Sequence, residues 1–72
     1  MDYDVNGGVG NVPQGLAVVG ETYTVDFTHN PTKQGATFSG WATSASGAAV
    51  YTSSGTNSFT AATDVTLYAK YT

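Results

Sequence analysis

Acidic and amide side chains near the start of the chain have the spacing of a cation-binding loop. Asp2-Tyr3-Asp4-Val5-Asn6-Gly7 matches the D-x-D-x-N-G opening of an EF-hand calcium loop, and oxygen ligands at alternate positions suit a hard cation. The twelfth position of such a loop is Pro13, which has no carboxylate to complete the coordination. A short strand that runs into an Asn-Gly turn explains the same residues. We therefore expect no metal site.

His29 is the other side chain with catalytic chemistry. It follows Asp26 by three residues, so the two would form an acid–base pair if they met. A lone histidine two residues before Pro31 is more typical of an exposed loop. The chain has no cysteine and no G-x-S-x-G segment to supply a nucleophile, and its acidic residues are dispersed. We predict that the chain is not an enzyme and that it has neither catalytic residues nor a cofactor.

Lys33 and Lys70 are the only basic side chains apart from the histidine. Some bacterial surface domains join a lysine to an Asn or Asp side chain through an isopeptide bond. That reaction needs a buried lysine beside an acidic catalyst, and nothing local in the sequence supplies such a triad. We expect no such bond here.

Aromatic rings are the remaining candidates for binding. Trp41, Tyr51 and Tyr68 would form a platform for a sugar ring if they gathered at the surface, with nearby hydroxyl and amide groups as hydrogen-bond partners. The chain has nine aromatic residues and only ten Val, Leu or Ile residues, so most rings are needed in the core. Both interpretations stay open. Tyr68 is the best candidate for an exposed ring, because it shares a strand face with Thr66 and Lys70.

Charge and length exclude several classes of protein. The 72 residues carry two Lys or Arg against five Asp or Glu, for a net charge of −3. Two cations cannot neutralise a phosphate backbone, so we expect no nucleic-acid partner. No apolar run approaches the ~18 residues that span a membrane, and the absence of cysteine excludes disulfides. We expect a single domain over residues 1–72, without membrane insertion and monomeric when isolated.

Strand patterns dominate the elements that must position these residues. Alternation over 22–28 puts Tyr23, Val25 and Phe27 on one face. A glycine inside the strand expected at 37–43 suggests a bulge, which would turn Trp41 toward the core. Further strands are expected at 3–6, 50–51, 57–60 and 65–71, the last with Leu67 and Ala69 on one face. One helical turn over 60–64 is allowed, so the fold class is mainly β, and α+β at most.

Three blocks of sequence follow one another along the chain. They are YDVNGG at 3–8, PTKQGATFSGW at 31–41 and VTLYAKY at 65–71. In this order and spacing they resemble the Listeria–Bacteroides repeat family, also called the internalin B-repeat. Ala36 and Tyr71 depart from the pattern, since the family usually has Tyr and Trp at these positions. The resemblance implies that the matching motif residues determine the fold: Gly35, Phe38, Gly40, Trp41, Leu67, Tyr68 and Ala69.

The resemblance also implies what such a chain does. It implies a small β-grasp-like module of four to five short strands, normally arranged in tandem along a secreted or cell-wall-attached bacterial protein, often an adhesin. The expected function is that of a non-catalytic spacer whose partners are the neighbouring repeats. The alternative is a weak binding module for a host glycan, mucin or protein receptor, in which Trp41, Tyr51 and Tyr68 contact the ligand and tandem copies raise the avidity.

Overall fold

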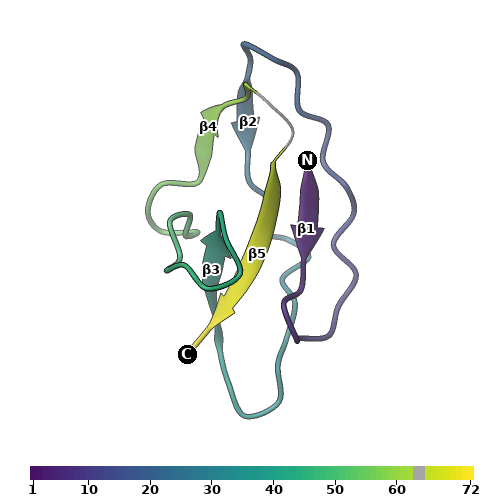
Figure 1. Cartoon of the computed structure of the whole chain (residues 1–72), viewed down its shortest axis with the longest axis vertical. Helices are drawn as coiled ribbons and strands as arrows, with labels where there is room; N and C mark the ends of the chain where they lie inside the picture. Colours follow the sequence, from purple (N-terminus) through teal and green to yellow (C-terminus); the bar gives the residue numbers. More distant parts are fainter. Residues whose placement is uncertain (63–64) are drawn as a thin grey trace.

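Five short strands make up the regular structure of the chain in a computed structural model that describes residues 1–62 and 65–72 (Figure 1). They are β1 (Asp2–Asp4), β2 (Thr22–Thr24), β3 (Phe38–Ala42), β4 (Ser58–Thr60) and β5 (Thr66–Tyr71). No helix occurs in the described ranges, so none there is long and apolar enough to cross a membrane. This confirms the mainly β fold class. The helical turn allowed over 60–64 falls partly on 63–64, outside the described residues.

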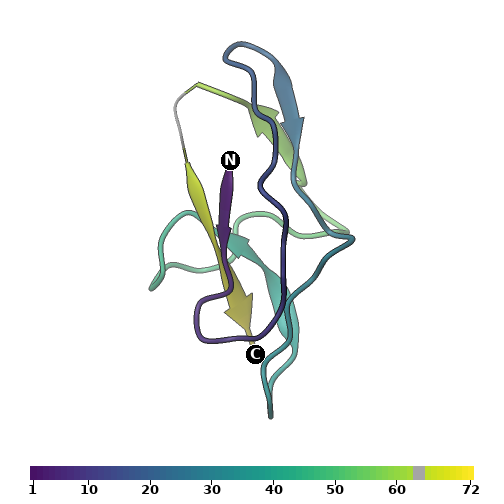
Figure 2. The same ribbon diagram turned by 90° about the vertical axis from the view of Figure 1, so that its right-hand side faces the viewer.

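The strands form two sheets. In the larger sheet β5 lies between β1, to which it is parallel, and β3, to which it is antiparallel. The smaller sheet pairs β2 with β4 in antiparallel orientation. The small sheet lies at one end of an elongated molecule, and the turn at 33–36 lies at the other (Figures 1 and 2). Because β1 pairs with β5 in parallel, the first and last strands of the chain are direct neighbours that run in the same direction.

β2 ends earlier than the alternation over 22–28 predicts. Val25 still donates its N–H to the Asn57 carbonyl, at 2.8 Å, but the ladder stops there. The Asp26 carboxylate accepts the backbone N–H groups of Thr28 and His29. A side chain that offers this local partner competes with strand pairing, so it turns the chain away. The predicted faces are still correct, because Tyr23 and Val25 are buried.

β3 contains the bulge expected at Gly40. The pairing of β3 with β5 shifts register between Phe38 and Gly40, and Trp41 then lies opposite Ala69. The extra residue rotates the strand so that Trp41 points inward. Its side chain is fully buried. The prediction that the glycine brings this ring into the core is confirmed.

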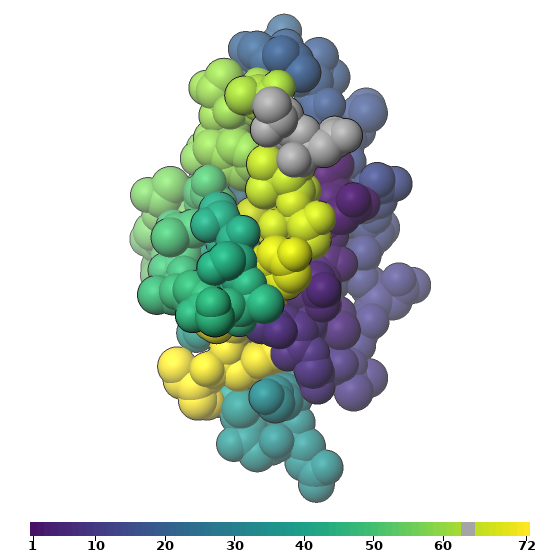
Figure 3. Space-filling view, in the orientation of Figure 1, coloured from purple at the N-terminus to yellow at the C-terminus, as the bar shows by residue number. Residues whose placement is uncertain are grey.

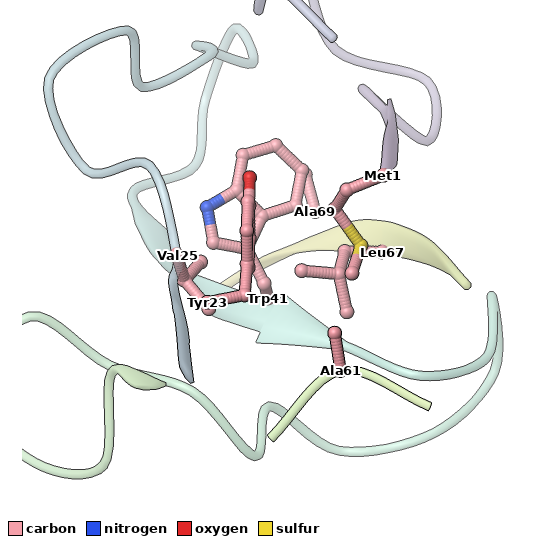
Figure 4. Packing of buried hydrophobic residues seen from close by; sticks show 7 residues of the cluster. All are labelled: Met1, Tyr23, Val25, Trp41, Ala61, Leu67 and Ala69. Carbon is pink, nitrogen blue, oxygen red and sulfur yellow. The ribbon is translucent and has the colours of Figure 1, made fainter. Parts of the chain in front are cut away.

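The core lies between the larger sheet and the segments that cross it (Figure 4). Its buried residues are Met1, Tyr23, Val25, Trp41, Ala61, Leu67 and Ala69. Six more rings are half-buried against this cluster: Tyr3, Phe27, Phe38, Tyr51, Phe59 and Tyr71. All the aromatic residues except Tyr68 thus pack on the core, as a chain with so few Leu and Ile requires.

Candidate functional site

The N-terminal Asp and Asn residues form a tight turn. Val5 accepts a hydrogen bond from the Gly8 N–H at 3.0 Å, and the Asp4 carboxylate accepts the Asn6 N–H at 2.7 Å. Asn6 and Gly7 both have positive φ, 52° and 86°, as the two central residues of a type I′ turn must. The predicted Asn-Gly turn is confirmed. The strand before it spans 2–4 instead of 3–6, because the turn already begins at Val5.

Asp26 and His29 do meet, in a surface loop. The His29 Nδ1 lies 3.0 Å from the Asp26 carboxylate, and the histidine side chain is 52% exposed. Burial acts to raise the pKa of Asp26, but hydrogen bonds from Thr28 and His29 outweigh it and lower that pKa. The carboxylate therefore serves as an acceptor that shapes the loop. In the described ranges no three His, Cys, Asp or Glu side chains gather as a metal site would need.

Lys70 and Asn6 converge on one carbonyl. The Lys70 Nζ donates to the Ala45 oxygen at 3.0 Å, and the Asn6 Nδ2 donates to the same oxygen at 3.2 Å. Asn6 also donates to the Ala69 carbonyl at 3.0 Å. These bonds tie the loop after β3 to β5. Both contacts to Ala45 lie at the surface, whereas isopeptide chemistry needs a buried lysine. These bonds therefore hold the loop after β3 against β5.

The three aromatic candidates do not form one platform. Trp41 is fully buried, so it offers no face to a ligand and leaves the candidate set. Tyr51 is half-buried and stacks on Phe59, with ring centroids 5.1 Å apart. Tyr68 is half-buried on the face of β5 opposite the buried Leu67. No pocket is found in the part of the chain that the structure describes. Tyr51 and Tyr68 therefore remain as two separate half-exposed rings.

A pair of tyrosines, which the sequence patterns do not reveal, connects the two sheets. The hydroxyl groups of Tyr3 in β1 and Tyr23 in β2 are hydrogen-bonded to each other. The Tyr3 hydroxyl also accepts the Asp26 N–H at 2.9 Å, and the Trp41 Nε1 donates to the Asp26 carbonyl at 3.0 Å. Both backbone groups of Asp26 are thus satisfied by core rings. This network holds the loop after β2 against the larger sheet.

Tyr23 and Tyr71 predict a loss of stability in alkali. Burial and the bond to Tyr3 raise the pKa of Tyr23, and burial with the nearby Asp4 raises the pKa of Tyr71, both above the ordinary value of 10.0. The folded chain thus holds these protons more tightly than the unfolded chain. The stabilisation is complete below pH 10 and decreases as the pH rises above it. Urea unfolding measured between neutral pH and strong alkali should show this decrease.

Tyr23→Phe should flatten that alkaline decrease, because the variant has no proton to lose at this position. It should also start from a lower stability, by about 1 kcal/mol, since the bond to Tyr3 is gone. Tyr68→Phe is the matched control, because its ring lies outside the core cluster. An alkaline slope that is the same in parent and Tyr23→Phe would show that Tyr23 does not carry the effect.

Apolar side chains are exposed on the loop before β2. The largest exposed apolar residues of the described chain are Val9, Leu16, Val18, Val19 and Val50. Three of them lie in the stretch 15–20, where four apolar residues stand between two glycines. Such a run is typical of a buried strand, and our interpretation of the sequence did not single it out. The observed position at the surface makes it a candidate contact site.

Comparison with known protein families gives a match over most of the chain. The model of a protein family described as the Listeria-Bacteroides repeat domain matches residues 1–70, nearly the whole chain. No curated protein and no solved structure matches the chain. The matched residues include the first two sequence blocks and all of the third except Tyr71, so the resemblance drawn from these blocks is confirmed.

Proposed function

The chain belongs to the Listeria-Bacteroides repeat family, and from this premise we propose that it is a non-catalytic spacer repeat of a secreted or cell-wall-attached bacterial protein, in which neighbouring repeats are its partners. The family match suggests a repeat of a bacterial surface protein and points to a structural module. The adhesin role and the place in the cell wall are part of the proposal.

The parallel pairing of the terminal strands is the observation that carries the proposal. Asp2 lies opposite Thr66 and Asp4 opposite Tyr68, so β1 and β5 run in the same direction side by side. A chain that enters at the start of β1 therefore leaves at the opposite end of the sheet (Figure 1). Each repeat then adds to the length of an array instead of folding it back. The molecule is elongated, with extents of 38 × 22 × 22 Å.

The same pairing suits a module under tension. A pull on the two ends moves β1 and β5 in opposite directions along the strand axis, across their shared hydrogen bonds, so these bonds resist together. The core behind them is tied across the sheets by Trp41 and the tyrosine pair. The implied β-grasp likeness is supported by the parallel neighbours at the start and end of the chain, although no helix occurs in the described ranges.

A weak binding module is the second candidate function. Tyr68 is the one ring outside the core cluster, and it shares its face of β5 with Lys70. A half-exposed ring beside a cation and hydroxyl groups suits contact with a sugar or a protein surface. Affinity at one such ring would be low, and a tandem array would raise it through multivalency.

Amide NMR of the labelled chain separates the two candidates. Mucin-type oligosaccharides are titrated into the chain, since weak binding still moves peaks. We expect a well-dispersed spectrum without localised shifts, and X-ray scattering in which each added copy lengthens the particle by most of one module. Shifts that gather around Tyr51 or Tyr68, and that Tyr68→Ala removes, would replace the spacer with the binding module.

A further inference from the structure

The loop before β2 presents apolar side chains in a fixed arrangement. We refer to residues 16–21 as the apolar loop. Leu16, Val18 and Val19 are 88%, 52% and 74% exposed. The Glu21 N–H bonds the Val18 carbonyl at 2.9 Å, and Gly20, with φ of 87°, occupies the position of that turn which requires a positive φ. Val19 is therefore held outward by the turn itself.

Further hydrogen bonds fasten the apolar loop to the body of the molecule. Gly20 donates to the Ala61 carbonyl at 2.8 Å, and Ala61 donates back to the Glu21 carbonyl at 2.9 Å. Ala17, between the exposed residues, packs against the core. A surface fixed in this way loses little conformational freedom when it binds, so even a small apolar contact is favourable.

The apolar loop lies beside the point where the chain enters the fold. The Gly15 N–H donates to the Met1 carbonyl at 2.9 Å, and the Met1 nitrogen donates to the Gly15 carbonyl at 3.1 Å. Leu16 is the next residue. In a tandem array, whatever precedes Met1 must therefore arrive next to the apolar loop. The occupant that this geometry favours is the preceding repeat.

The opposite end of the molecule is complementary to the apolar loop. The apolar loop and β2 form one end of the space-filled molecule, and the turn at 33–36 forms the other (Figure 3). The exposed Val9 pairs with Thr32, directly before that turn. Lys33 lies in the turn, and Lys70 is near the end of β5. The apolar loop carries Glu21, so opposite charges would face each other across a contact between two repeats.

We propose that the apolar loop packs head to tail against the Val9–Lys33 end of the preceding repeat. The proposal rests on the spacer function, which it deepens by naming the partner surface. A head-to-tail contact between unlike surfaces repeats without closing, so it builds an open array. Each contact couples nearest neighbours, which stiffens the array and stabilises every repeat that has a predecessor. The covalent link supplies the high effective concentration that so small a contact needs.

A two-copy chain tests the contact, with two copies of this sequence joined by a short flexible linker. We expect its urea midpoint to exceed that of the single chain by about 1 M. Leu16→Ser, Val18→Thr and Val19→Thr together in the second copy should abolish the gain. The same three changes in the first copy should have no effect, because the apolar loop of that copy has no predecessor. The two variants have the same composition, so the comparison between them is an internal control.

Further variants keep the test decisive. The triple variant of the single chain should unfold at the parent's midpoint, since the altered side chains are exposed, and Val50→Thr is the control for one exposed valine elsewhere. Glu21→Lys in the second copy should lower the gain, and adding Lys33→Glu in the first copy should restore it.

Equal midpoints for one and two copies, or equal losses from either copy, would overturn the contact. In that case a scattering profile that still lengthens with each copy would leave the spacer function standing. Oligosaccharide-induced shifts at Tyr51 or Tyr68 would instead remove the spacer function itself. The two failures thus have separate readouts.

Discussion

Replacing Trp41 by alanine is expected to unfold the chain. The indole is fully buried and packs edge-on against Tyr3 and Phe38, with ring centroids 4.7 and 5.3 Å away. Its Nε1 also satisfies the Asp26 carbonyl at 3.0 Å. Loss of such a ring costs about 3–5 kcal/mol, which is as much as the core of so small a domain supplies. Amide NMR dispersion and urea unfolding measure the outcome.

Trp41→Phe and Tyr68→Ala are the comparison variants for Trp41→Ala. Trp41→Phe keeps an apolar ring but leaves the Asp26 carbonyl without its donor, so it should fold with reduced stability, by about 1–3 kcal/mol. Tyr68→Ala removes a ring outside the core cluster and should cost much less than Trp41→Ala. A Trp41→Ala chain with the parent's spectrum and urea midpoint would mean that the ring is not part of the core.

Strand faces and the bulge could be predicted from the sequence because both follow from local rules. Side chains alternate along a strand, so Leu67 and Ala69 had to share a face, and both are buried. Gly40 breaks the alternation within 37–43, and a bulge is the simplest way to place Trp41 inside. The Asn-Gly turn is equally local, because both central residues must accept positive φ.

Other features could not be predicted because they depend on partners far along the chain. β2 stops where the Asp26 side chain offers its carboxylate to the next backbone N–H groups, a competition that alternation does not reveal. The hydroxyl hydrogen bond between Tyr3 and Tyr23 is another such feature, because it joins β1 and β2, which lie in different sheets. The apolar loop resembles a buried strand in sequence, and it is exposed because no described segment covers Leu16 or Val19.

The exposure of the apolar loop is a feature of the fold that the proposed function explains. An isolated domain gains nothing from exposing three aliphatic side chains on a well-fastened turn. A repeat with a predecessor at Met1 buries them and gains stability from its neighbour. The feature that a single-domain interpretation leaves unexplained is thus accounted for once the chain is considered as one unit of an array.

Gly40→Ala is expected to damage the fold through a single added methyl group. A Cβ at this position would collide with the Tyr51 carbonyl oxygen and would also crowd Ala49 and Thr52, at 3.2 and 3.3 Å. The Tyr51 oxygen is the acceptor for the Trp41 N–H at 2.9 Å, so it cannot move away without breaking the bridge that holds the strand. We expect a loss of about 1–3 kcal/mol or more from this overpacking, measured by urea unfolding.

Gly35→Ala is the control that separates collision from backbone strain. Gly35 has φ of 81°, and nothing lies within 4 Å of its added Cβ, so its replacement costs only the left-handed conformation, about 1–2 kcal/mol. Gly40→Ala should lose more than this and should also shift the amide peaks of the 49–52 segment. If the two variants lose the same stability and the 49–52 peaks stay in place, close approach of that segment is not what requires a glycine. The bulge would then depend on backbone conformation alone, and Trp41 would keep its place without the bridge to Tyr51.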